Sequence, residues 1–495
     1  QDERILQGNS QRLHQGSRAG SGSRLHTGGT RRNSGIQSNE VPQPDGTQQR
    51  STEREGGLLP GDADVLNTEQ EKSLEDSPAL VPFEADRNDV EAFNKSKKYA
   101  DNIEAIRTVL TLITENRKAT PDEKKILSRY VGFGGLKEVL LDPDSDNWNK
   151  SDNQYKDQVR EVIELANRFD AATGTKDTFN KIRGSILNAH YTSATVIEGI
   201  YNGLKKIGFK KGNILEPSAG IGNFITYMPE SIKGKSNISA VELDNLTGNI
   251  LKYLHDNVAV QISGIENAVI PNNSQDLVIS NVPFGNYKVY DKKFKGEKEQ
   301  FLNRIHNYFF AKAIDQAREG GLIVFVTSKG VLDAPGNEAI RRYLNQNAEF
   351  LGAVRLPSNT FQKTANTQVT TDVIFLQKSK SGNSRERFIG VKEVDAIHKD
   401  GGTEKVSVNE YFINHPENML GTIEAGGLYS RNDYSFIDNG ASKDLSKVIR
   451  SMLPENVFTP VKSAMGSQAN DIKQSIEDVK EGNIVISNER RGGSR

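Results

Sequence analysis

From residue 186 onward, short apolar segments alternate with amphipathic helical segments. The apolar segments have strand length and lie at 213–216, 238–242, 276–280, 321–327 and 350–356. Strands that alternate with helices pair in parallel, because each helix carries the chain back across the sheet. The pattern therefore predicts an α/β fold, with a mostly parallel, doubly wound, Rossmann-like sheet over 186–380.

A helical domain is predicted before this sheet, over 86–185. One helix is indicated by apolar residues at helical spacing, namely Ile103, Ile106, Val109, Leu110 and Ile113. Another begins at Thr120-Pro-Asp-Glu123, where a capping threonine, a proline at the first helical position and a capping-box glutamate follow one another. The glycine-rich run Tyr130-Val-Gly-Phe-Gly-Gly-Leu136 comes next and is either a helix terminator or a functional loop.

The remaining segments are polar or weakly patterned. Residues 1–85 are rich in Gly, Ser, Gln, Asn and Arg without apolar periodicity, which predicts a disordered tail. We expect a small accessory unit of short strands and turns over 381–465, suggested by 388–391 and 429–436, and a polar tail or linker over 466–495. The chain starts at Gln1 and stops after Gly492-Gly-Ser-Arg495, so we expect a fragment of a longer product.

Composition excludes several classes of protein. The absence of cysteine excludes disulfides, thiolate zinc sites and cysteine nucleophiles, and the seven histidines are not spaced as ligands, so no metal is expected. No apolar run reaches the length of a membrane span, and no secretory signal is present, so we expect neither membrane insertion nor export. The 64 Lys and Arg nearly balance the 65 Asp and Glu, so any nucleic-acid surface must be local.

The first chemical signal is Asn213-Ile-Leu-Glu-Pro-Ser-Ala-Gly-Ile-Gly-Asn-Phe224, a strand that ends in a Gly-x-Gly turn. Gly220 and Gly222 allow the backbone to approach a ligand closely, and Glu216 is placed to accept a hydrogen bond from a ligand ammonium. Position 225 is Ile, where a dinucleotide site would have a third glycine. A nucleotide other than NAD is therefore favoured.

The second strand, Ile238-Ser-Ala-Val-Glu-Leu-Asp244, ends in acidic residues. A carboxylate at this position can accept both hydroxyls of a ribose. Glu242 is our choice for this role, with Asp244 as the alternative cap of the next helix.

The third signal is Asp276-Leu-Val-Ile-Ser-Asn-Val-Pro-Phe-Gly285. An exocyclic amine of a base is a poor nucleophile, and hydrogen-bond acceptors on its protons help it to react; Asn281 Oδ1 and the Val282 carbonyl can serve. Pro283 restricts the backbone on both sides, and Phe284 offers a face for stacking a base. A plain core strand with a turn is the alternative, but the three signals in succession within one sheet favour a site.

These residues resemble the amino-group DNA methyltransferases of the gamma arrangement, the N-6 DNA methylases, over about 186–378. The resemblance implies S-adenosylmethionine as methyl donor and N6 of adenine in DNA as acceptor. It makes Asn188-Ala-His-Tyr-Thr-Ser-Ala-Thr195 the upstream motif, with Tyr191 and Thr192 near the methionine part of the cofactor. A plain helix cap at Ser193 is the alternative.

The resemblance also distributes the other site residues. It assigns Glu216, Gly220 and Gly222 to the amino-acid part of the cofactor, Glu242 to the ribose and Glu266 to the adenine ring. Phe361 falls where such enzymes place a second aromatic against a base flipped from the duplex, ahead of a hairpin strand expected over 371–376, although a core phenylalanine is the alternative. The family's Asn-Pro-Pro-aromatic motif is Asn281-Val282-Pro283-Phe284 here, so full activity is not implied.

Flanking segments resemble the methylase portion of large methylase-helicase proteins of bacterial conjugative elements and phages. These segments are Tyr130-Val-Gly-Phe-Gly-Gly135, His306-Asn-Tyr-Phe-Phe310 and Thr370-Thr-Asp372. The resemblance implies DNA as partner, a helicase region in the same full-length polypeptide, and a cytoplasmic location in a bacterium or phage-infected host. Two other functions stay open: methylation of RNA or of protein glutamine, and a DNA-binding or anti-restriction module that has lost turnover.

Overall fold

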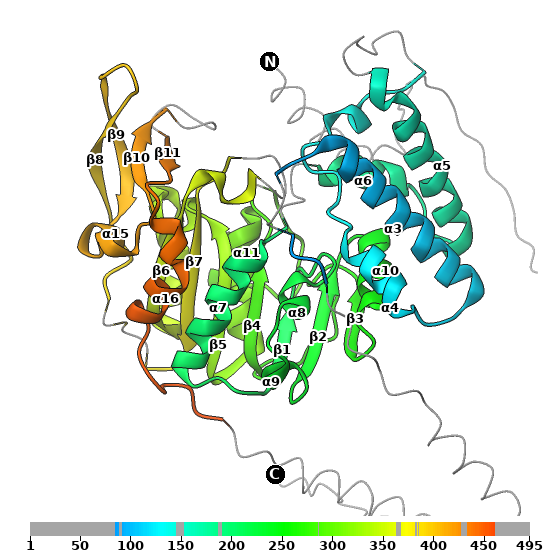
Figure 1. Cartoon of the computed structure of the whole chain (residues 1–495). Helices are drawn as coiled ribbons and strands as arrows, with labels where there is room; N and C mark the ends of the chain where they lie inside the picture. The colour runs from blue at the N-terminus through cyan, green and yellow to red at the C-terminus, as the bar shows by residue number, and fades with distance from the viewer. Residues whose placement is uncertain are drawn as a thin grey trace, which may run out of the picture. The chain divides into compact units, whose positions relative to one another are not determined.

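The computed structural model describes most of the chain between residues 85 and 460 (Figure 1). The described residues are 85–88, 92–144, 153–186, 191–285, 287–362, 368–381, 384, 386–426 and 433–460. The predicted tails up to residue 84 and from 466, and Asn188-Ala-His190 of the upstream motif, lie outside them.

A seven-stranded sheet forms the centre of the described chain (Figure 1). Its strands are β1 Asn213–Glu216, β2 Asn237–Glu242, β3 Val258–Ile262, β4 Gln275–Asn281, β5 Ala317–Ser328, β6 Ala348–Leu356 and β7 Thr371–Lys378. The order is β3-β2-β1-β4-β5-β7-β6, and only β7 runs antiparallel to its neighbours. This confirms the predicted Rossmann-like sheet and adds β3, which was not predicted.

The sheet is buried on both faces, as its nearly continuous apolar strands require. Along β4, Leu277 and Ile279 join one hydrophobic cluster and Val278 joins the other, because successive side chains point to opposite faces. Helices cover both clusters, so the fold is doubly wound. One face carries α7 Ala194–Ile207, α10 Asn245–Leu254 and α16 Leu445–Met452; the other carries α11 Ile305–Gln316 and α13 Glu338–Asn347.

Four helices of the described chain precede α7: α3 Lys95–Glu115, α4 Pro121–Ser128, α5 Lys156–Thr173 and α6 Thr178–Ser185. The predicted capping box at the start of α4 is confirmed, since Thr120 Oγ1 accepts from Glu123 N and the Glu123 carboxylate accepts from Thr120 N. None of the described helices is long and apolar enough to cross a membrane.

The glycine-rich loop after α4 is fixed against α3. Asn102 is fully buried; its side chain donates to Gly132 O (2.7 Å) and accepts from Val131 N (3.0 Å). Lys98 Nζ donates to Gly134 O (2.6 Å), and burial lowers the pKa of Lys98 to about 7. The loop is therefore an ordered structure that α3 holds in one conformation.

A second, four-stranded sheet follows, of order β11-β10-β8-β9. Its strands are β8 Val391–Ile397, β9 Thr403–Asn409, β10 Thr422–Ala425 and β11 Tyr434–Ile437. The shorter helices of the described chain are α8 Asn223–Thr226, α9 Glu230–Lys233, α12 Gly330–Asp333 and α15 Glu410–Asn414. The segment 388–391, expected to form a short strand, overlaps β8 only at Val391. The segment 429–436 overlaps β11 at 434–436, and its residues 429–432 lie outside the described part of the chain.

Buried charges join the two sheets. The Arg355 guanidinium on β6 donates to Asp372 of β7 (2.7 Å) and to Asp333 of α12 (2.8 Å), and Tyr434 OH on β11 donates to Asp333 (2.6 Å). All four side chains are buried. Because each charge has an opposite charge or a hydrogen-bond donor beside it, the cluster fixes the second sheet against the first without an unpaired buried ion.

Candidate active site

The carboxyl ends of β1, β2 and β4 meet at one edge of the central sheet. Glu216, Glu242 and Asn281 are the last residues of these three strands. The chain leaves β1 toward β2 on one side, while β4 pairs with β1 on the other. Ligands of open α/β sheets bind at such a reversal of strand order. The structure therefore brings the three predicted polar residues to the place where a ligand is expected.

The turn after β1 depends on its two glycines. Gly220 has φ 57° and Gly222 has φ 82°, in the left-handed region that favours glycine. A Cβ on Gly220 would lie 3.2 Å from the ring of Tyr191, and one on Gly222 would lie 2.7 Å from Leu251. Neither position accommodates a side chain, so the turn offers bare backbone to the edge of the sheet.

Glu242 holds this turn through its carboxylate. One oxygen accepts from Gly220 N (2.7 Å) and the other from Asp244 N (2.9 Å). Burial raises the pKa of Glu242 to about 7, although these backbone N–H groups lower it. Asp244 caps α10 by accepting from Thr247 N (2.8 Å), which confirms the alternative considered for it.

Glu216 lies deeper, with 2% of its surface exposed. Burial raises its pKa well above the usual value, and the charge of Glu242 adds to this effect. Among the described residues, its Oε2 has no hydrogen-bond partner. Burial disfavours the ionised form of both carboxyl groups, and a ligand that brings hydroxyl and ammonium donors would stabilise that form.

The turn at 191–194 lies against the glycine turn through Tyr191. Ser193 caps α7 by accepting from Val196 N (3.4 Å), as the sequence indicated. The Thr192 carbonyl accepts from Asn223 Nδ2 (3.3 Å) at the start of α8. The two turns are thus joined by a side-chain contact and a hydrogen bond.

The segment Asn281–Phe284 extends from the end of β4 beside the glycine turn. Ser280 Oγ donates to Ser218 O (3.0 Å), which ties β4 to that turn. Asn281 Oδ1 is shielded from solvent, and Val282 N donates to Val326 O (3.0 Å) on β5. Pro283 and Phe284 are half-buried, so part of the Phe284 ring is exposed.

Comparison with known proteins shows which family this part of the chain resembles. Residues 179–411 match the family model of the N-6 DNA methylases. These 233 residues are just under half of the chain, and they contain the central sheet with its candidate site. The match implies S-adenosylmethionine as the cofactor, which brings hydroxyl and ammonium donors to the buried carboxyl groups at the edge of the sheet.

Individual proteins share parts of this chain. Over 200 residues it is 32% identical to the defense against restriction protein B of Escherichia phage P1, a match that covers 39% of this chain and 8% of the phage protein. A methyltransferase subunit of the type I restriction-modification system of Streptococcus thermophilus is 14% identical, with a TM-score of 0.36 over 74% of this chain and 76% of that one. A further structure of the type I restriction-modification system gives 14% identity and a TM-score of 0.34 over 79% and 96%. Because these TM-scores are below 0.5, the assignment of the fold is based on the strand order of the central sheet.

Two predicted site residues lie outside the contacts described so far. Glu266 follows β3, and its segment is tied to the site because Ser263 N donates to Glu242 O (2.9 Å). Its Oε1 accepts from Asn267 Nδ2 (2.9 Å). Phe361, by contrast, is fully buried in the hydrophobic cluster that contains Val326. The structure therefore favours the core alternative for Phe361 in this conformation.

Two residues that hold the turns of the candidate active site were not predicted from the sequence. Asn88 donates from Nδ2 to Thr192 O (3.0 Å) and accepts from Ala194 N (2.9 Å). His255 Nε2 lies 3.2 Å from Ile221 O in the glycine turn, and burial lowers the pKa of His255 to about 3. A neutral imidazole therefore donates to the turn. Neither residue belongs to a recognisable motif, since both act on main-chain atoms that are distant in the sequence.

Proposed function

We propose that this chain transfers a methyl group from S-adenosylmethionine to N6 of adenine in DNA. The observation that carries the proposal is the position of Asn281–Phe284, which leaves β4 directly beside the glycine turn. A site that binds cofactor and target base in adjoining places can hold the two reacting atoms in line.

The residues at the strand ends fit the cofactor. Glu242 is placed to accept the ribose hydroxyls and Glu216 to accept from the ammonium of the methionine part, which would give its unpartnered oxygen a donor. The backbone of Gly220 and Gly222 leaves room for close approach. Tyr191 and Thr192 border the methionine end, and Glu266 is assigned to the adenine ring because its segment continues from Glu242.

The acceptor chemistry falls to two oxygens. S-adenosylmethionine supplies a methyl group activated by its sulfonium, so transfer forms a bond from N6 to carbon, breaks a carbon–sulfur bond and releases one proton. Asn281 Oδ1 and the Val282 carbonyl accept hydrogen bonds from the N6 amino group, and these bonds strengthen as positive charge develops on nitrogen. Phe284 stacks on the base.

Val282 stands where the family motif has a proline, and the structure compensates for the difference. A proline restrains this position through its ring, whereas Val282 has a backbone N–H that donates to Val326 O (3.0 Å) and a side chain that is 1% exposed. The hydrogen bond and the burial replace the restraint of the ring. We therefore expect the Val282 carbonyl to be held in place, and the chain to be active.

The role of Phe361 as a second stacking residue remains part of the proposal. It requires the ring to leave the hydrophobic cluster in which it is buried. If the ring stays in the core, Phe284 alone stacks on the base.

DNA is the proposed partner, together with a helicase region in the same full-length polypeptide. The three flanking segments that resemble methylase-helicase proteins support the helicase region, as does the much greater length of the phage relative. Sequencing of the complete reading frame around residues 1–495 tests this directly: a helicase region is expected, and its absence would remove this part of the proposal.

The acceptor is tested with labelled S-adenosylmethionine offered separately to duplex DNA, RNA and a glutamine-containing protein mixture. We expect label in N6-methyladenine of DNA. Label in RNA or in glutamine would replace the proposed acceptor. Tight cofactor binding without transfer to any acceptor would favour a DNA-binding or anti-restriction module without turnover. Such a function is consistent with the name of the phage relative, defense against restriction protein B.

A further inference from the structure

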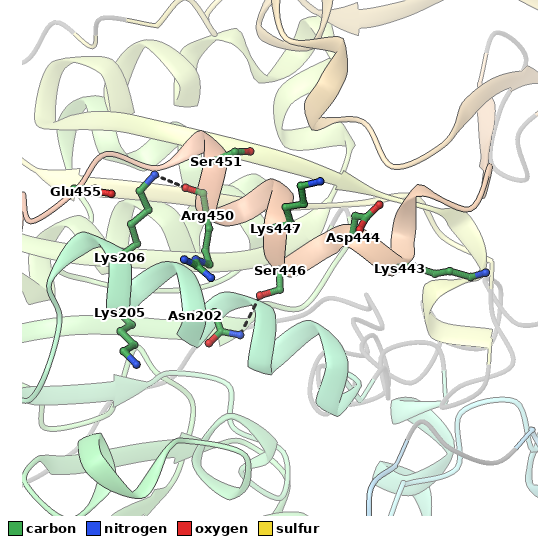
Figure 2. A pocket seen from close by; sticks show the side chains of 10 residues that line it. All are labelled: Asn202, Lys205, Lys206, Lys443, Asp444, Ser446, Lys447, Arg450, Ser451 and Glu455. Carbon is green, nitrogen blue, oxygen red and sulfur yellow. Dashed lines mark hydrogen bonds between the residues drawn. The ribbon is translucent and has the colours of Figure 1, made fainter.

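A groove lies between α7 and α16, on the outer side of the helical layer (Figure 2). Its volume is about 880 Å³. The two helices run in the same direction, because Asn202 Nδ2 donates to Ser446 Oγ (3.0 Å) near one end and Lys206 Nζ donates to Arg450 O (2.5 Å) near the other. The groove therefore follows both helix axes.

The walls of the groove are basic. Five cations line it against two acids; the cations are Lys205, Lys206, Lys443, Lys447 and Arg450, and the acids are Asp444 and Glu455. The whole chain has a formal net charge of −1, so this is a local concentration of positive charge. Three of the cations come at i, i+4 and i+7 from 443 to 450 and so lie along one face of α16 and its preceding turn.

Most of these cations are not used by the fold. Lys206 is bound to the last turn of α16, but Lys205, Lys443, Lys447 and Arg450 are exposed, and their side chains form no ion pair or hydrogen bond with the described residues. Several arginines elsewhere in the described chain pair with acids, as Arg107 does with Glu161 and Arg160 with Asp144.

The groove is rigid because its two helices pack closely. A Cβ on Gly203 of α7 would lie 2.5 Å from Ile449 and 2.8 Å from Leu453, so only glycine permits this approach. Ile449 and Leu453 are fully buried in the cluster beneath. Close packing fixes the backbone that carries the cations, so only their side chains lose conformational freedom when a partner binds.

The groove is also connected to the candidate active site. Ser193, the N-cap of α7, borders the cofactor turn, and Asn202 is nine residues further on, about 14 Å along the axis at about 1.5 Å per residue. About four base pairs of duplex span the same length. A duplex that reaches the active site is therefore long enough to reach the groove.

We propose that the groove between α7 and α16 binds the phosphate backbone of DNA outside the target base pair. This rests on the proposed function for the identity of the polymer. The groove contributes affinity without sequence preference, because lysine and arginine contacts to phosphate carry no base information.

The test compares Lys447→Gln/Arg450→Gln and Lys447→Glu/Arg450→Glu with the unchanged full chain. The measurement is binding of a fluorescent 30-base-pair duplex between about 50 and 200 mM salt, by anisotropy. Each phosphate contact contributes about 0.9 to the slope of log affinity against log salt. We expect the slope to fall by about 2 in both variants and the affinity at 0.1 M salt to fall about 10-fold or more in the charge-reversed variant.

Lys235→Glu/Lys252→Glu is the matched control, since both lysines are exposed and lie outside the groove. Equal losses of affinity in the control and in the groove variant would overturn the proposal, as would an unchanged slope in the groove variants. Thermal unfolding and cofactor affinity show whether each variant is folded, and the neutral variant avoids acids near the end of α16. DNA binding is measured without methyl transfer. A chain that binds DNA through the groove but transfers no methyl group would therefore contradict the proposed function and not the proposal about the groove.

Discussion

The side chain of Asn88 donates a hydrogen bond to the carbonyl oxygen of Thr192, with an N···O distance of 3.0 Å. It thereby reaches from the segment before the helices to the turn that borders the cofactor in the proposed function. Because Asn88 also accepts from Ala194 N (2.9 Å), one amide satisfies two main-chain groups of this turn.

Replacing this amide tests whether the contact positions the cofactor turn. We expect Asn88→Ala to weaken S-adenosylmethionine binding by about 10-fold, the effect of losing one to two hydrogen bonds. Titration calorimetry measures the affinity. Arg160→Ala is the control, because its pair with Asp144 is exposed on both sides and exposed pairs contribute little. Equal effects of the two substitutions would contradict a specific role for Asn88.

The raised pKa of Glu242 predicts pH-dependent cofactor binding. Because folding raises the pKa of the Glu242 carboxyl group to about 7, protonation of this group stabilises the folded state. This stabilisation is fully present below the unfolded pKa and is lost as the pH rises through 7. Cofactor binding has the opposite sign, because the ionised carboxylate is the better acceptor for the ribose hydroxyls. We expect about 10-fold tighter binding at pH 8 than at pH 6. Glu242→Gln should bind weakly at both pH values, and a wild-type affinity independent of pH would exclude this role.

The neutral state of His255 predicts sensitivity to acid. Its pKa is lowered to about 3, so its contribution to stability is complete above its unfolded pKa of 6.5 and is lost as pH falls toward 3. We expect the free energy of unfolding to decrease in this window by at most about 1.4 kcal/mol per pH unit from this group. His255→Gln keeps a donor for Ile221 O and should show a shallower loss in thermal melts. An unchanged slope would mean that His255 is protonated in the folded chain.

Close packing of α7 on α16 predicts a steric effect at Gly203. An added Cβ would lie 2.5 Å from Ile449, so Gly203→Ala should lower the free energy of unfolding by about 1–3 kcal/mol. Denaturant unfolding measures this. Gly184→Ala in α6 is the matched control, since nothing lies within 4 Å of its added Cβ and alanine favours a helix. A Gly203→Ala chain as stable as the control would show that the two helices separate readily.

The sequence was most informative where a local pattern determines the structure. Asp244 and Thr120 are caps whose partners lie three residues away, so both were predicted from sequence. The strand β1 was predicted with its observed bounds because an apolar run ends there in a glycine turn. Strand β3 was missed because its residues Val258–Ile262 are partly exposed at the edge of the sheet and lack a continuous apolar signal.

Contacts between distant segments were not predictable in the same way. Asn88 bonds to main-chain atoms more than 100 residues away, and no periodicity marks such a residue. Phe361 illustrates a second limit. The sequence around an aromatic residue beside a motif does not show whether its ring faces a bound base or the hydrophobic core, and the Phe361 ring lies in the core. The contacts of a side chain are therefore harder to predict from the sequence when its partners are more distant in the chain.

The most direct test of the central claim is transfer of labelled methyl from S-adenosylmethionine to mixed-sequence DNA by the intact chain and by Asn281→Ala, with nucleoside analysis of the product. Cofactor affinity is measured for both proteins, so that a loss of binding is distinguished from a loss of transfer. We predict N6-methyladenine from the intact chain and at least about 100-fold less from Asn281→Ala, with similar cofactor affinity. Equal transfer by the two proteins, or no transfer by an intact chain that binds the cofactor, would contradict the account.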